Sequence, residues 1–318
     1  MYSLIQHAKY VINNRREKPT AVLFSYLCNA FKILFYIPQH IQLSKVLKPF
    51  SSLGLIANRT YYVYLSRYLS YALSTEMRLD ILINHYKYFK KNFPYHILRS
   101  IFKDGLVCWS ETRGSDNFEI RLVDAYPYET EGSLSFVFNV NGTPLYTVSF
   151  TFSPGNHFGL VEDQVLYVTR IQGAKESLDI ISGATKTFSD NTPPVLLISA
   201  IEGMALSLGI RTIVGISLHN QIGYALVGQS GFQKNYDEFW KTYESVKISN
   251  SDYLLSLPIA YKGLSLIKSK HRSRVLAKRK VREGISRKVY SFFMNNVLTG
   301  KRVRFSPLRV VRESKATA

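Results

Sequence analysis

The stretch SLSFVFNVNGTPLYTVSFTF, residues 133–152, decides the fold. Asn141 and Gly142 lie between two runs rich in Val, Phe, Tyr and Thr, which is the composition and the turn of a β-hairpin with a two-residue type I′ loop. Apolar residues occupy both faces of the two strands, so we expect the sheet to be covered on one side and partly on the other. The cross-strand pairs that this turn predicts are Val140 with Thr143, Phe138 with Leu145, Val137 with Tyr146 and Phe136 with Thr147.

The sequence after the hairpin changes from strand to helix periodicity. A third strand is predicted over residues 165–171, and the period changes to about 3.6 at Gln172-Gly173. A helix is expected over 176–188. A second helix begins with Thr192 as N-cap and Pro193 at its first position, ends at Gly209, and precedes a buried strand over 212–217. This order predicts an α+β core with a mainly antiparallel, mixed sheet and flanking helices.

The remaining segments place helices before this core and after it. Residues 61–73 form an aromatic, helix-like stretch, and Phe93-Pro94 ends a helix predicted over 77–91. The sequence divides into a helical N-terminal region (1–74), an α+β core (75–262) and a basic helical C-terminal tail (263–318). The other predicted elements are strands over 105–109 and 118–123, a short helix over 220–228, a turn at Gly231-Phe232 and a basic helix over 264–289.

The net charge of +19 is concentrated at the C-terminal end of the 318-residue chain. From Lys262 onward there are 17 Lys and Arg against Glu283 and Glu313, a balance of +15, which leaves +4 for the residues before it. Such a tail is expected to bind phosphate groups of anionic lipid or of nucleic acid. Cys28 and Cys108 form no metal-ligand or disulfide pattern, so we expect reduced thiols in a cytoplasmic protein.

Residues 20–38 are the most apolar window of the chain. Asn29 and Lys32 interrupt it, so it lacks the run of about 20 apolar residues that a membrane span needs. Its apolar stripe fits a helix packed on the core, or an interfacial helix flanked by the basic residues Arg15, Arg16 and Lys18. The N-terminus shows no signal-peptide pattern. We therefore expect a cytoplasmic protein, peripheral on the inner membrane if it contacts lipid at all.

Several short motifs, in a fixed order, resemble the VirK/YbjX family of bacterial proteins over residues 75–290. They are Glu131-Gly132-Ser133-Leu134-Ser135, Leu145-Tyr146, Gln172-Gly173, Ala184-Thr185-Lys186, Tyr236-Asp237-Glu238-Phe239-Trp240, Leu257-Pro258 and Lys268-Ser269-Lys270-His271-Arg272. Arg170 departs from the small apolar run that relatives tend to have before Gln172. The resemblance implies a role in virulence, in adaptation of the cell envelope and in resistance to antimicrobial peptides. It implies no defined reaction or cofactor.

The order of strands, turn, helices and buried strand is also similar to that of acyl-CoA-dependent N-acetyltransferases (GNAT-like). In those enzymes the backbone N–H groups of a turn before a helix bind the pyrophosphate of the cofactor. The residues in the matching place are Gln172, Gly173, Ala174 and Lys175, with Thr185 and Lys186 on the following helix. Acyl-CoA is therefore a possible cofactor. A tight turn with no ligand is the alternative, as is a Lys186 that points into solvent.

His219 and Asp237 are the candidate catalytic residues, and Tyr236 and Trp240 are candidate ligand contacts. His219 follows a buried strand, where ligand crevices of α/β sheets tend to lie. The alternatives are a hydrogen-bonded structural His and a helix whose Trp packs inward. The His and Cys residues form no metal pattern, and no nucleophile elbow, phosphate-binding loop or dinucleotide fingerprint occurs.

Two functions follow from these patterns. The first is a VirK/YbjX-like protein with an acyltransferase-like core that acts at the inner membrane face on lipid or other envelope components. The second is a non-enzymatic accessory or regulatory protein whose basic tail binds RNA or a protein partner. Nucleic acid is the less favoured partner, because no known nucleic-acid-binding motif accompanies the charge.

Overall fold

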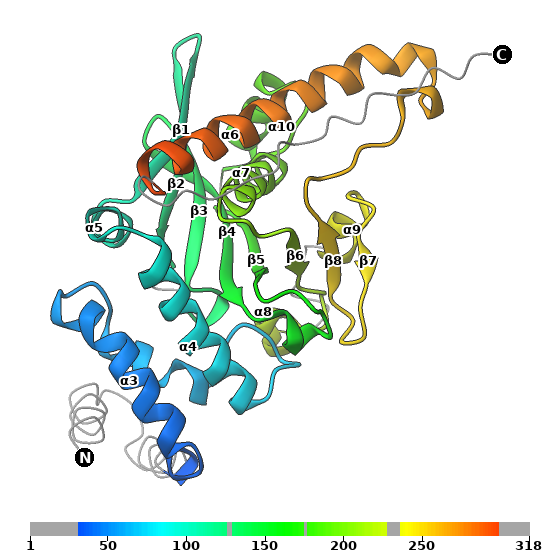
Figure 1. The fold of residues 1–318 in the computed structure, drawn as a ribbon. Helices are drawn as coiled ribbons and strands as arrows, with labels where there is room; N and C mark the ends of the chain where they lie inside the picture. The colour runs from blue at the N-terminus through cyan, green and yellow to red at the C-terminus, as the bar shows by residue number, and fades with distance from the viewer. Residues whose placement is uncertain (1–30, 126–128, 175–176, 228–235, 299–318) are drawn as a thin grey trace.

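The computed structural model describes residues 31–125, 129–174, 177–227 and 236–298. The predicted α+β class is confirmed: an eight-stranded mixed sheet is flanked by helices (Figure 1). The strand order is β1-β2-β3-β4-β5-β6-β8-β7. The strands are β1 (Leu106–Arg113), β2 (Asp116–Asp124), β3 (Leu134–Val140), β4 (Thr143–Ser153), β5 (Val165–Gly173), β6 (Thr212–Gly215), β7 (Val246–Lys247) and β8 (Tyr253–Ser256).

The predicted hairpin is β3 and β4, and its register differs from the expectation. Val140 pairs with Thr143 as predicted, but a β-bulge then shifts the ladder by one residue. Leu145 is the extra residue, and it is fully buried. The bulge accommodates Pro144, which has no N–H for the ladder, and lets Leu145 reach the core. The predicted pairs beyond the turn are therefore wrong, and the observed ones are Phe138 with Tyr146, Val137 with Thr147 and Phe136 with Val148.

One face of the sheet is apolar and carries the main helices. Phe136 and Phe138 of β3 and Phe150 and Phe152 of β4 are fully buried. In Figure 1 the helices on this side of the sheet are α4 (Thr75–Asn92), α7 (Pro193–Ser207) and α10 (Ser269–Asn296), and α10 crosses over α7. A Cβ added to Gly203 of α7 would lie 2.2 Å from the Ser286 carbonyl oxygen of α10, so this glycine permits the crossing.

The opposite face of the sheet is polar, as the alternation of side chains along each strand requires. Ser135 of β3 pairs with Ser149 of β4, which in turn pairs with Arg170 of β5. These three side chains are buried. The polar face therefore holds a hydrogen-bonded layer in place of a second apolar core.

The helices around the core follow most of the predictions, but the helix predicted over 61–73 is absent and α5 (Tyr95–Lys103) was not predicted. α6 (Leu178–Thr187), α7 with N-cap Thr192, α8 (Ile222–Val227) and α9 (Tyr236–Lys241) lie where helices were predicted. The stretch 61–73 is instead a 3₁₀ helix, η1 (Asn58–Leu65), followed by irregular chain. The helix prediction fails there because Leu69 adopts a positive φ of 65° and donates its N–H to the Thr130 carbonyl. Gly231-Phe232 lies outside the described residues.

The N-terminal helix is only partly described. Residues 31–35 are helical, and α3 (Ile37–Ser52) continues to the core, where Leu43, Leu47 and Phe50 are buried. Phe31, Leu34 and Phe35 are 59–68% exposed, whereas Ile33 is 4% exposed and belongs to the core, so only one face of this part of the 20–38 window packs on the core. Figure 1 places α3 and the start of α10 at opposite ends of the molecule.

The basic helix α10 is anchored at one end and exposed at the other. Its second half is held on the sheet layer by Ile285, Val289 and Phe293, which are buried. Its first half, residues 269–280, is exposed at most positions and carries six Lys and Arg with no acidic residue. We call residues 269–280 the basic half of α10. The division of the chain into the regions 1–74, 75–262 and 263–318 stays a prediction.

Candidate functional site

The parallel strands β5 and β6 separate toward their C-terminal ends. They pair only from Leu166↔Ile213 to Val168↔Gly215, and the last bond between them runs from the Ile216 N–H to the Val168 carbonyl. A bulge at Thr169 shifts the pairing of β5 with β4. We call the opening between residues 169–173 of β5 and residues 216–218 the fork. It is the place at which the sequence predicts a ligand crevice.

The side chain of Tyr236, on α9, enters the fork. Its phenol oxygen lies 3.0 Å from the backbone nitrogen of Ile171 and 3.3 Å from the carbonyl oxygen of the same residue. It accepts from the first group and donates to the second. Burial raises the pKa of Tyr236 above its ordinary value, so the phenol stays neutral. The backbone groups of β5 that a ligand would use in the fork are thus bonded to this tyrosine.

Trp240 attaches the other end of α9 to β6. Its indole N–H donates to the Ile216 carbonyl at 2.9 Å, and its side chain is fully buried. The ring lies directly on Gly215, where an added Cβ would come within 2.2 Å of the indole. The close contact explains why the strand carries glycine at this position. The inward-packing reading of Trp240 is the one that the geometry supports.

Asp237 binds the backbone next to His219, but the two side chains lie in different environments. An Asp237 carboxylate oxygen accepts the N–H of Leu218, the neighbour of His219, at 3.0 Å. His219 is exposed, and its ring meets Tyr224 edge to face at 5.6 Å. Asp237 therefore fixes the loop after β6. Among the described residues, no hydrogen bond between the two side chains is seen.

A buried ion pair lies on the polar face beside the fork. Arg170 of β5 meets Glu131 at 3.1 Å, with the side chains 9% and 18% exposed. Glu131 also accepts from the Gln221 amide at 2.8 Å, and the Arg170 Nε donates to the Gln172 side-chain oxygen at 2.9 Å. We call Glu131, Arg170, Gln172 and Gln221 the polar cluster. These hydrogen bonds fix the side chains of Glu131 and Arg170 in place. Removing either side chain would leave the charge of the other buried without an opposite charge beside it.

The turn after β5 has fewer free donors than an anion site needs. The Ala174 N–H donates to the Leu145 carbonyl at 2.8 Å. Gly173 lies beneath the ring of Tyr146, 3.0 Å from where its Cβ would be. Burial raises the pKa of Tyr146 to about 12, so this ring is also a neutral phenol at physiological pH. Lys175 lies outside the described residues.

Thr185 and Lys186 lie apart from the fork. The Thr185 hydroxyl donates to the Ile181 carbonyl within α6, and Lys186 is exposed. The next residue, Thr187, accepts from the Arg113 guanidinium of β1 through its carbonyl. β1 is the far edge of the sheet from β6. The predicted site residues therefore divide into a group at the fork, with Gln172, His219, Tyr236, Asp237 and Trp240, and a pair beside β1.

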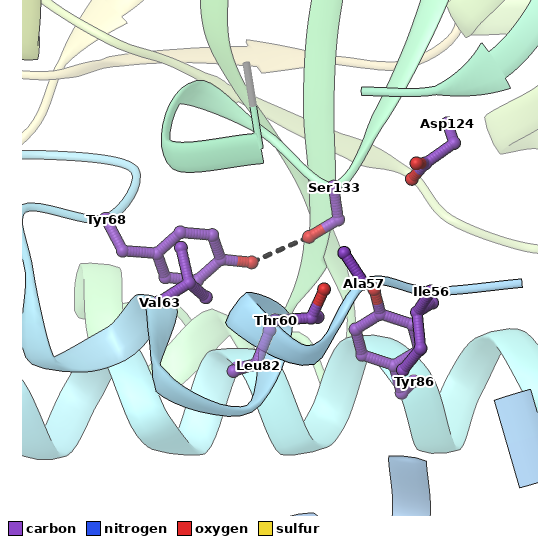
Figure 2. A pocket seen from close by; sticks show the side chains of 9 residues that line it. All are labelled: Ile56, Ala57, Thr60, Val63, Tyr68, Leu82, Tyr86, Asp124 and Ser133. Atoms are coloured by element: carbon purple, nitrogen blue, oxygen red, sulfur yellow. Dashed lines mark hydrogen bonds between the residues drawn. The ribbon is translucent and has the colours of Figure 1, made fainter. Parts of the chain in front are cut away.

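A small cavity lies between η1, α4 and the start of β3 (Figure 2). Its volume is about 20 Å³, and the Tyr68 hydroxyl and the Ser133 hydroxyl bond across it at 2.6 Å. That volume accommodates roughly one water molecule. The cavity is too small for a substrate.

The structure adds two findings about binding capacity. Within the described ranges, no three His, Cys, Asp or Glu side chains are grouped as a metal site would require. Likewise, no helix in the described part of the chain combines the length and the apolarity of a membrane span. Cys108 is a free, buried thiol whose pKa burial raises, and it is therefore unreactive.

Sequence reasoning missed three members of the polar cluster. Glu131, Arg170 and Gln221 come from separate segments, and only the fold brings them together. One signal was present: Arg170 interrupts an apolar strand, and a buried Arg needs a partner. Glu131 is the carboxylate that supplies it.

The comparisons with known proteins give a family without a known activity. No curated protein and no solved structure matches this chain. The sequence model of one family, described as "Protein of unknown function (DUF535)", matches residues 24–281. That range includes the strands, the fork and the basic half of α10. The chain therefore belongs to the DUF535 family.

Proposed function

We propose that this protein binds anionic membrane surfaces through the basic half of α10, as a non-catalytic, VirK/YbjX-like component of envelope adaptation, virulence and antimicrobial-peptide resistance. The observation that carries the proposal is the exposure of this segment. Lys270, Arg272, Arg274 and Lys280 all point to solvent, and Leu276 is 48% exposed among them. A cationic surface with apolar side chains between the charges is the composition that binds at a bilayer interface.

The occupied fork supports a non-catalytic role. The Ile171 backbone groups are bonded to Tyr236, and the Ala174 N–H is bonded to Leu145. A cofactor that binds along β5 needs these groups, so it would have to displace α9. The basic half of α10 requires no such change.

Flotation with lipid vesicles tests the proposal. The purified protein should float with vesicles that contain phosphatidylglycerol and remain behind with pure phosphatidylcholine, and added salt should reverse the binding. Lys270→Gln, Arg272→Gln and Arg274→Gln together should weaken binding about 100-fold, since each cation near an anionic surface contributes about 1 kcal/mol.

A matched control removes three exposed lysines from α3 and α4. Lys45→Gln, Lys48→Gln and Lys90→Gln change the net charge equally and should leave flotation intact. If both triple variants lose vesicle binding equally, the binding depends on the net charge of the protein and not on the basic half of α10. No flotation, together with a salt-sensitive shift of RNA, would favour the accessory protein that binds RNA.

An acyl-CoA-dependent acyltransferase is the second candidate, and the sheet topology favours it. In the part of the chain that the structure describes, the sheet has one parallel pair, β5 and β6, joined by a crossover through α6 and α7, and the pair separates beyond a bulge. This supports the resemblance to N-acetyltransferases, with Gln172, Gly173 and Ala174 at the cofactor and His219 and Asp237 at the reacting group. Calorimetric titration with acetyl-CoA and palmitoyl-CoA distinguishes the candidates. Binding that Gly173→Asp abolishes would favour the acyl-CoA-dependent candidate over the non-catalytic one.

A further inference from the structure

A groove separates α10 from the edge strand β1. Its volume is about 290 Å³, close to the lower limit for small-molecule sites. We call it the Trp109 groove. One wall is β1 with Trp109, Glu111 and Arg113, and the other is α10 with Lys280, Gly284 and Lys288.

Two aromatic rings give the groove an apolar wall with cations beside it. Trp109 and Phe188 are 4% and 0% exposed, and their rings meet edge to face at 5.8 Å. The Arg113 guanidinium lies 4.3 Å from the centre of the Phe188 ring. The Lys288 ammonium lies 5.9 Å from the centre of the Trp109 ring. Both are within the range of cation–π contact.

The charges of the lining are unbalanced in favour of anions. Arg113, Lys280 and Lys288 stand against Glu111, which leaves +2. Glu111 bonds Arg113 at 2.7 Å and Lys288 at 3.2 Å. Burial opposes the ionisation of Glu111, but these bonds outweigh it and hold its pKa below the ordinary value. Lys280 is exposed. The Glu111 carboxylate therefore positions Arg113 and Lys288, and the charge of Lys280 has no carboxylate of the groove bonded to it.

The indole N–H of Trp109 is a buried donor for which the described residues supply no acceptor. Leaving such a group unsatisfied costs free energy, and most buried polar groups in proteins are paired. The other tryptophan, Trp240, follows that rule through the Ile216 carbonyl. The nitrogen itself has almost no accessible surface, so a ligand oxygen in the Trp109 groove would satisfy this donor after a small movement of the neighbouring side chains.

Gly284 leaves the helix side of the groove open. A Cβ added there meets no atom within 4 Å. Glycine inside a helix is less favourable than alanine. Gly284 therefore lowers the stability of α10 while leaving space in the groove. Such a residue is expected where a ligand needs that space.

We propose that the Trp109 groove binds a phosphate monoester that carries an alkyl chain. The phosphate oxygens accept from the Trp109 indole N–H and pair with Lys280 and Lys288, and the chain lies against the apolar wall of Trp109, Phe188 and Val281. The groove shares Lys280 with the basic half of α10, but Lys270, Arg272 and Arg274, which the flotation variant changes, do not line it.

Intrinsic fluorescence tests the proposal, because the chain has two tryptophans. Trp240 is fully buried and hydrogen-bonded, so a change on titration reports Trp109. Dodecyl phosphate below its micellar concentration should give a saturable change, which Trp109→Phe removes. By calorimetry, Trp109→Phe should bind about tenfold more weakly because the donor is lost. Inorganic phosphate should bind at least tenfold more weakly than dodecyl phosphate, and dodecyl maltoside should not bind.

Two variants locate the ligand. Gly284→Leu fills the groove from a position free of neighbours, and Lys280→Gln removes an exposed cation with little risk to folding. Both should weaken binding of dodecyl phosphate tenfold or more, while Gly183→Leu, at an open glycine of α6, should not.

Unchanged binding of dodecyl phosphate in Lys280→Gln and Gly284→Leu would overturn the site. Inorganic phosphate binding as tightly as dodecyl phosphate would overturn the alkyl part. Gly284 lies outside residues 269–280, so membrane flotation of Gly284→Leu should equal that of the wild type. Failure here and failure of the proposed function are therefore distinguishable.

Discussion

The phenol oxygen of Tyr236 lies 3.0 Å from the backbone nitrogen of Ile171 and satisfies both backbone groups of that residue. Tyr236 and Trp240 thereby join α9 to the two strands of the fork, since Trp240 bonds Ile216 after β6. The motif Tyr236-Asp237-Glu238-Phe239-Trp240 is explained by this joining role. It needs no ligand to account for its composition.

Tyr236→Phe removes one hydroxyl from this contact and leaves the Ile171 N–H and carbonyl unpaired in a buried place. We expect the free energy of unfolding to fall by about 1–3 kcal/mol. Chemical denaturation measures it. Tyr95→Phe, at a side chain 52% exposed, is the control and should change stability by less than about 0.5 kcal/mol. Equal stability of the two variants would show that the phenol does not hold the fork.

Gly215→Ala places a methyl group against the Trp240 ring. Because the added Cβ would lie 2.2 Å from the indole, the ring or the strand must move. We expect a loss of about 1–3 kcal/mol in the free energy of unfolding, together with a change in Trp240 fluorescence. Gly183→Ala in α6 meets no atom within 4 Å and should be neutral or stabilising. A Gly215→Ala variant as stable as the wild type would contradict the packing described for α9.

Glu131→Gln leaves the Arg170 guanidinium buried without its carboxylate. We expect a loss of roughly 3 kcal/mol in the free energy of unfolding, because removing one member of a buried pair is costly. The exposed pair of Arg274 and Asp190, at 2.8 Å, provides the comparison. Asp190→Asn should cost about 0.5 kcal/mol or less. Similar losses in the two variants would mean that burial does not distinguish the pairs.

Glu202 of α7 predicts a pH dependence of stability. Burial, its largest influence, raises the pKa of this carboxyl above 4.5, although the Ile259 N–H donates to it at 2.7 Å. The folded state thus holds the proton more tightly than the unfolded state does. Stability is lost as pH rises from about 4.5 through the folded pKa. Glu202→Gln keeps an oxygen acceptor for Ile259 and lacks this loss.

The stability difference between Glu202→Gln and the wild type should therefore grow in favour of the variant across that pH window and then level off. Thermal unfolding at a series of pH values measures the difference. A difference that stays constant with pH would show that Glu202 does not titrate with a raised pKa.

Local signals in the sequence predicted the elements well. The Asn141-Gly142 turn, the Thr192-Pro193 helix start and the Gly209 helix end depend on backbone chemistry within a few residues, so they can be read directly. The bulge at Leu145 cannot, because it arises from Pro144 and from the burial of Leu145 against distant residues. The segment 61–73 was misread for the same reason: the contact of Leu69 with Thr130 is tertiary.

The candidate site was predictable only in part. The sequence placed His219 after a buried strand and Gln172 at the turn after another, but it did not show that Gln172, His219 and Asp237 lie at the same fork. It did not show that Tyr236 occupies the fork. The sequence Tyr236-Asp237 is equally compatible with a tyrosine that contacts a ligand and with one that bonds the backbone of a neighbouring strand. It also could not pair Glu131 with Arg170, which are distant in sequence and meet across the bulge in β5.

Hydrogen–deuterium exchange of the protein with and without phosphatidylglycerol vesicles tests the central claim most directly, because it locates the contact. The account predicts slower exchange in peptides covering residues 269–280 and unchanged exchange in peptides covering 168–174 and 215–221. The same experiment with acetyl-CoA should leave all three regions unchanged. Slower exchange at 168–174 and 215–221 on addition of acetyl-CoA, with none at 269–280 on addition of vesicles, would contradict the account.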